Sequence, residues 1–100
     1  MPDLLATRVD VAQNVRHERA RRLEAIWRER VHIAEEKYSL ASAHCCKVQA
    51  DYAGRQLPSP DGDYALQQAV KGEREARAEY MRVLHILTRL LVAGEIPEEP

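Results

Sequence analysis

The sequence contains no phenylalanine, four glycines and five prolines. The prolines stand at positions 2, 58, 60, 97 and 100, so two long stretches lack the strongest helix breaker. The only two cysteines, Cys45 and Cys46, are adjacent, which excludes a disulfide framework and favours reduced thiols. The longest apolar-rich stretch, 83–93, contains Arg89 and is shorter than the about 20 apolar residues that cross a bilayer.

No charge of one sign dominates the chain. Lysine and arginine number 15 and the acidic residues 16, which removes the global argument for binding nucleic acid or an anionic membrane. A length of 100 residues, 45% of them hydrophobic and 31% charged, indicates a single folded domain. The N-terminus shows no charged segment followed by an apolar run, so we expect no signal peptide and a cytoplasmic location.

The stretch from Ala12 to Ala53 contains neither proline nor glycine and is rich in strong helix formers. It predicts one helix over about 10–53, with Asp10 and Gln13 as a capping box, although Asp3 would cap an earlier start because nothing between the two aspartates forbids a helix. Weak alternation over 7–11 would also fit a short strand, but a lone strand has nothing to pair with. Helix or frayed coil is therefore the favoured interpretation of the first dozen residues.

A second helix is predicted over about 60–93, after a connection at 54–59. Gly54 is expected to end the first helix, and Pro60 suits the first position of the second. Gly94 and Pro97 stop the second helix, which leaves an acidic, solvated tail at 94–100. The fold class is thus all-α, an antiparallel two-helix hairpin.

Apolar seams at alternating spacings of three and four residues support this hairpin. Folding the chain at the turn brings residues whose numbers sum to 114 opposite each other, so Trp27 faces Leu87 and Cys45 faces Ala69. Large side chains then oppose small ones at both tyrosine layers, as close packing requires. The seams comprise Leu23, Trp27, Val31, Ala34, Tyr38, Ala41, Cys45, Val48 and Tyr52, and Leu66, Ala69, Glu73, Ala76, Tyr80, Val83, Leu87 and Leu90.

Further apolar stripes beside both seams exceed what two helices bury against each other. The longer first helix also overhangs the second, and its overhang carries Val15. We therefore predict a homodimer that forms a four-helix bundle. The alternative is a monomer that leaves these residues exposed. The predicted oligomer interface consists of Val15, Ile26, Ile33, Leu40, Leu84 and Leu91.

An arginine-rich segment in the first helix is a candidate site for nucleic acid. Guanidinium groups bind phosphates, and the possible contacts are Arg16, Arg19, Arg21 and Arg22. Interleaved glutamates at helical spacing favour an ordinary solvated face instead.

Two polar clusters are candidate chemical sites. Glu29 and His32 have the Glu-x-x-His spacing of metal-binding bundles, with Glu36 one turn further, but a di-metal site needs more inward glutamates. Glu73 lies inside the second seam, where we expect a buried polar contact with Lys37 or His44 that fixes the register.

No nucleophile motif or glycine-rich phosphate loop is present, so we predict no catalytic residue, no metal site and no cofactor. The favoured function is a non-enzymatic intracellular module that scaffolds or regulates a protein partner as a helical homo-oligomer without binding membranes. One alternative is a nucleic-acid accessory protein that uses the arginine-rich segment. Another is a ferritin-like metal-binding bundle.

Overall fold

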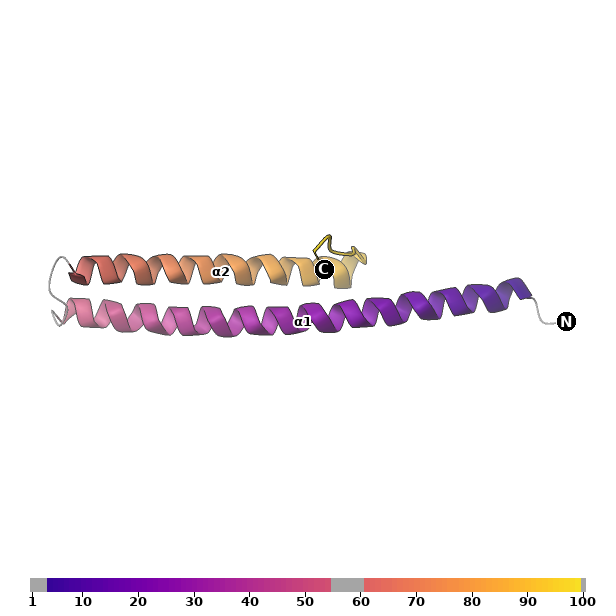
Figure 1. Ribbon diagram of the computed structural model, residues 1–100, viewed down its shortest axis with the longest axis horizontal. Coiled ribbons are helices and arrows are strands. Elements are labelled where there is room, and N and C mark those ends of the chain that lie inside the picture. Colours follow the sequence, from indigo (N-terminus) through magenta and orange to yellow (C-terminus); the bar gives the residue numbers. More distant parts are fainter. Residues whose placement is uncertain (1–3, 55–60, 100) are drawn as a thin grey trace.

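The computed structural model describes residues 4–54 and 61–99, with side chains described from residue 13 onward. It contains helix α1 (Leu4–Ala53) and helix α2 (Asp61–Ala93), which lie side by side as a hairpin (Figure 1). α1 begins before the expected start near residue 10, because nothing between Leu4 and Asp10 breaks a helix. Asp10 therefore lies inside α1 and its capping box does not mark the start. Residues 7–11, whose alternation would also fit a short strand, are helical.

The described helix ends show how the chain leaves each helix. α1 ends at Ala53, and the Gly54 N–H donates to the Ala50 carbonyl oxygen at 2.9 Å. The rest of the expected connection lies outside the described residues. α2 ends before Gly94, whose φ of 65° is the left-handed conformation that glycine adopts without strain, and the Gly94 N–H donates to the Leu90 oxygen at 3.1 Å.

Two apolar clusters join the helices in the predicted register. Trp27 and Leu87 lie in the cluster distant from the turn, and Cys45 and Ala69 lie in the cluster near it. Tyr80 packs against the first of these clusters, and its ring lies 6.0 Å from the Tyr38 ring between centroids, so the two tyrosines also contact each other. The buried members are Trp27, Ala34, Val83, Leu87 and Leu90 in the first cluster, and Cys45, Val48 and Ala69 in the second.

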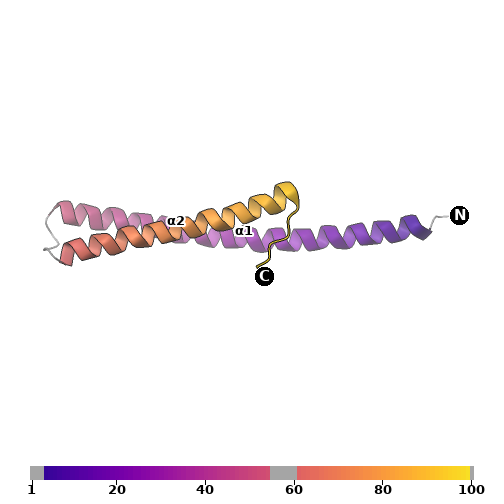
Figure 2. The same ribbon diagram turned by 90° about the horizontal axis from the view of Figure 1, so that it is seen from above.

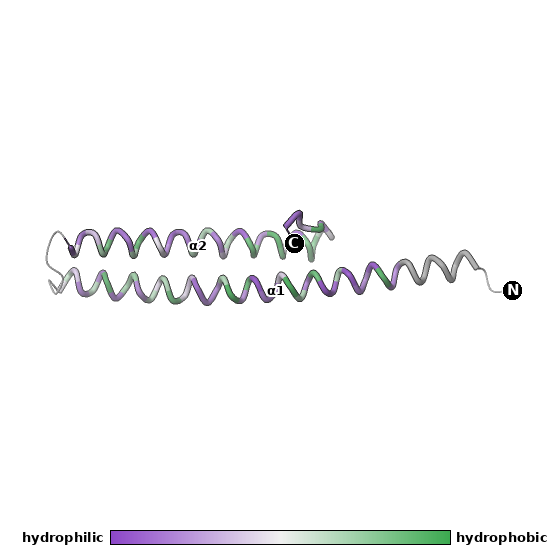
Figure 3. The backbone as a smooth tube through the Cα atoms, viewed as in Figure 1, coloured by the Kyte–Doolittle hydropathy of each residue, from purple (hydrophilic) through white to green (hydrophobic). Residues whose placement is uncertain are grey.

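The hairpin is thin and elongated, and the helices cross at a shallow angle (Figure 2). Its principal extents are 83 × 18 × 17 Å, and its radius of gyration of 22.4 Å compares with about 13 Å for a compact domain of this length. The N-terminal part of α1 continues well beyond the end of α2. Hydrophobic positions recur along both helices (Figure 3) and do not gather at one site.

The acidic tail folds back along α2 and is held by ion pairs. Glu95 accepts a hydrogen bond from Arg89 Nε at 2.8 Å, and Glu99 pairs with Arg82. Arg82 also contacts Glu79 at 2.7 Å. The tail glutamates Glu95, Glu98 and Glu99 are exposed, as expected for a solvated tail. Nothing in the sequence pattern indicated the ion pairs that Glu95 and Glu99 form with α2.

Candidate interaction surface

The most exposed large apolar residues of α1 form one stripe, which we call the α1 stripe: Val15, Ile26, Ile33 and Leu40. On a helix that advances about 100° per residue, these four side chains fall within a sector of about 40°. Leu40 is 72% exposed, Ile26 46% and Ile33 42%. Ile26, Ile33 and Leu40 recur every seven residues, and exposed apolar side chains that recur on one face of a helix are a surface suited to another helix.

The α2 members of the predicted interface lie on a different face of the hairpin. Ile33 borders an open groove with Lys37 and Arg82. Leu84 follows Tyr80 by one turn, and Tyr80 borders a hollow on the other face. Leu84 is half-buried and Leu91 exposed. The six predicted interface residues therefore do not make one patch, because α1 and α2 turn their stripes to opposite sides of the antiparallel hairpin.

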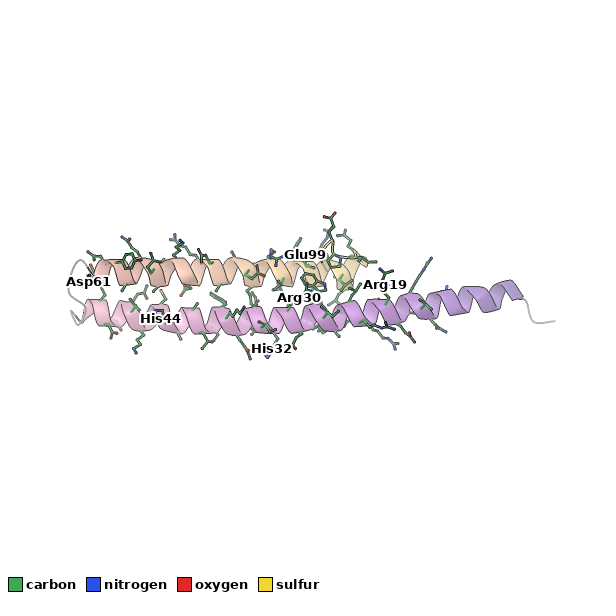
Figure 4. All side chains as sticks on the ribbon, viewed as in Figure 1. Arg19, Arg30, His32, His44, Asp61 and Glu99 are labelled. Carbon is green, nitrogen blue, oxygen red and sulfur yellow. The ribbon has the colours of Figure 1, made fainter. Side chains whose placement is uncertain are left out.

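The arginine-rich segment lies on the overhang of α1, where α2 no longer covers it. Arg16, Arg19 and Arg21 are exposed and form no ion pair within the described part of the chain. Arg22 pairs with Glu18 at 3.5 Å. Figure 4 places Arg19 just beyond the end of α2.

An apolar hollow accompanies these cations. It has a volume of about 430 Å³, and Arg16 and Arg19 border it together with Leu23, Leu90 and Ile96. The end of α2 thus offers apolar contact and positive charge at one place.

The candidate metal ligands lie on the surface of α1. His32 Nε2 is 3.1 Å from a carboxylate oxygen of Glu36, and both side chains are exposed. Figure 4 shows His32 on the side of α1 turned away from α2. Glu29 is also exposed. Among residues 13–54 and 61–99, no three histidine, cysteine, aspartate or glutamate side chains lie close enough to hold one ion.

The structure does not place Glu73 in the expected contact with Lys37 or His44. Glu73 is half-buried, whereas Lys37 and His44 are exposed, and neither makes an ion pair with Glu73 in the described chain. The reason is the face on which each residue lies: Lys37 lines the groove with Glu79, and Glu73 lies near Cys45. Burial raises the pKa of the Cys45 thiol, and the adjacent Glu73 carboxylate raises this pKa further.

Ion pairs on α2 shift two carboxyl pKa values. The hydrogen bond from Arg82 lowers the pKa of Glu79, and the one from Arg89 lowers the pKa of Glu95. These groups are exposed, so both pairs add little to overall stability, and the Arg89–Glu95 pair also holds the tail beside α2.

Trp27 and Arg30 form a contact that sequence reasoning missed. Trp27 is fully buried, and the Arg30 guanidinium lies 4.4 Å from the centroid of its ring. The indole Nε1 finds no acceptor among the described residues. The spacing of three residues on one helix was the available signal.

No known protein family, no curated protein and no solved structure matches this chain. Neither helix, in the part that the structure describes, is long and apolar enough to cross a membrane.

Proposed function

We propose that this chain is a non-enzymatic interaction module that works as a homo-oligomer and scaffolds or regulates a protein partner. The α1 stripe carries the proposal, because it places three large aliphatic side chains in one exposed row. Their burial against another helix is worth about 1.5–3 kcal/mol for each side chain that goes from fully exposed to fully buried.

The shape of the hairpin supports association. Its accessible surface is 8141 Å², whereas a compact monomer of 11.4 kDa exposes about 5,800 Å². A standard interface covers about 800 Å² on each partner, which this elongated surface provides readily. A hairpin with so few buried side chains also gains relatively more from a partner than a large domain does.

We propose a cytoplasmic location on the basis of the thiols. Cys46 is exposed, and an exposed unpaired thiol is typical of a reducing compartment.

A second candidate function, nucleic-acid binding, is favoured by one observation. Arg16, Arg19 and Arg21 extend beyond α2 without ion-pair partners in the described chain. Binding to phosphates through these groups must weaken steeply as salt rises, whereas apolar association changes little.

Light scattering on the chromatographic peak of the full chain, with absorbance at 260 and 280 nm, tests both proposals. We expect a dimer or larger even-numbered oligomer whose mass is unchanged by added salt. A monomer across the micromolar range would contradict the module as proposed. Nucleic acid that co-elutes at low salt and is released at high salt would favour the second candidate.

A further inference from the structure

We infer that the second copy docks in parallel, with its α1 along the α1 stripe of the first, so that Ile26, Ile33 and Leu40 meet their own counterparts. This inference rests on the proposed function, since it names the partner of that surface and its orientation. The stripe lies about 120° around α1 from the seam that packs on α2. α2 therefore leaves the stripe open along its length, as the exposures of Ile26, Ile33 and Leu40 show.

The charges beside the stripe follow a repeated pattern. An acid followed directly by a base occurs at Glu18-Arg19, Glu29-Arg30 and Glu36-Lys37. The steps of 11 and 7 residues between these pairs are close to whole numbers of turns. Relative to Ile33, the acids of the pairs fall about 40–60° to one side and the bases about 40–60° to the other. The stripe thus has an acidic edge and a basic edge.

Symmetry decides which edges meet in a dimer. A two-fold axis parallel to the helices brings the acidic edge of each copy against the basic edge of the other, on both sides of the contact. A two-fold axis perpendicular to the helices, which produces an antiparallel pair, brings acid against acid and base against base. Opposite charges across a helix contact stabilise it and like charges destabilise it, so the pattern favours the parallel dimer.

The groove beside the basic edge fits this arrangement. It has a volume of about 410 Å³ and lies between α1 and α2. Its charged lining consists of three bases, Arg30, Lys37 and Arg82, and of two acids, Glu79 and Glu99, which both pair with Arg82. The acidic edge of the second copy would lie along its rim, with Glu36 of the second copy near Lys37 of the first. Two residues depart from the pattern. Arg22 lies on the line between Val15 and Ile26 and is paired with Glu18, and Lys47, seven residues after Leu40, lies about 40° to the acidic side of Ile33.

Disulfide cross-linking of the full chain tests the orientation. In a Cys45→Ala/Cys46→Ser background, Ile26→Cys and Leu40→Cys should each form a disulfide with its own counterpart under mild oxidation. Positions 26 and 40 are about 21 Å apart along the helix, whereas bridged Cβ atoms lie about 3.5–4.5 Å apart, so a wrong register is not cross-linked. Val92→Cys is the matched control, because it is 82% exposed but lies on α2 and should remain monomeric in denaturing gels.

Charge variants provide a second test that leaves the apolar row intact. Lys37→Glu makes both edges acidic at this level and should weaken the dimer about threefold to tenfold, as two exposed ion pairs are lost by symmetry. Adding Glu36→Lys exchanges the two edges and should restore dimerisation. In an antiparallel dimer, Lys37→Glu would instead relieve repulsion between bases and strengthen association. Circular dichroism confirms that each variant remains helical.

The outcomes separate this inference from the proposed function. Self-cross-linking at 26 and 40 together with rescue by the exchanged pair supports the parallel dimer. Cross-linking only when the Ile26→Cys and Leu40→Cys chains are mixed overturns it in favour of an antiparallel dimer. A dimer in light scattering with no cross-link at either position overturns the inference and leaves the proposed function standing, whereas a monomer overturns both.

Discussion

Trp27 is the side chain on which the packing of the hairpin depends most. It is the largest fully buried residue, and it packs with Val83, Leu87 and Leu90 of α2. Replacing it by alanine removes the contact between the helices at the end distant from the turn. Trp→Ala changes in protein cores cost about 3–5 kcal/mol, because the lost burial adds to the cost of the cavity left behind.

That cost is large for a fold of this size. Native domains are stable by about 5–15 kcal/mol, and small helical folds lie at the lower end of this range. We therefore expect Trp27→Ala to remove cooperative unfolding altogether or to lower the midpoint in urea severely. Trp27→Phe is the informative companion: it keeps most of the aromatic volume and removes the indole N–H, which has no acceptor in the described chain. An unsatisfied buried donor costs about 1–3 kcal/mol, so its removal offsets the lost ring contacts.

The assay is urea unfolding followed by circular dichroism at 222 nm, with free energies from linear extrapolation. Because the chain has one tryptophan, fluorescence of the unchanged protein reports the same transition from the core. We expect Trp27→Phe to stay within about 1.5 kcal/mol of the parent and Trp27→Ala to lose at least twice as much. A Trp27→Ala variant with an unchanged midpoint would refute the packing of α1 on α2 described above.

Three further predictions follow from burial and charge. Cys46 should react with a thiol reagent at once and Cys45 only through opening of the helices, because Cys45 is buried and its pKa is raised; equal rates would contradict this. The hydrogen bond from Arg89 lowers the pKa of Glu95, so docking of the tail should persist above pH 4.5, the ordinary glutamate value, and be lost as the pH falls through the lowered pKa. NMR titration of the carboxyl groups measures this pKa, and a Glu95 pKa that Arg89→Gln leaves unchanged would refute the prediction. Leu40→Ala should lower the melting temperature by an amount that depends on protein concentration, because the variant loses a contact between copies. Leu40 is 72% exposed within one chain, so in a monomer its replacement would change the stability by no more than about 0.5 kcal/mol.

The helices and their register were accessible from the sequence for identifiable reasons. The stretch without proline or glycine predicted most of α1 but not its start at Leu4, and the absence of proline predicted α2, which contains Gly62 and Gly72. Gly94 ends α2, and its positive φ explains why a glycine stands there. The seam spacing placed Trp27 with Leu87 and Cys45 with Ala69, because apolar periodicity reports directly which side of a helix is covered.

The distribution of surface residues between the two faces was harder to predict. The sum rule that pairs Ala41 with Glu73 gives positions along the helices but not the side on which each flanking residue lies. Lys37 therefore faces Glu79 rather than Glu73. The pair between Arg82 and Glu99 of the tail had no periodic signal to reveal it. To predict the face on which a flanking residue lies, one needs the handedness of the helices and their antiparallel directions as well as the spacing of the apolar residues.

The orientation of the proposed dimer also links the two functional candidates. In a parallel dimer the overhangs of both copies lie at the same end, so Arg16, Arg19 and Arg21 of each copy would join into one basic surface. In an antiparallel dimer these segments would lie at opposite ends of an assembly at least as long as the 83 Å hairpin. Because the slope of affinity against salt grows with the number of phosphates contacted at once, only the parallel form would double that slope on assembly. Cross-linking at position 26 therefore also decides whether nucleic-acid binding, if measured, should depend on dimerisation.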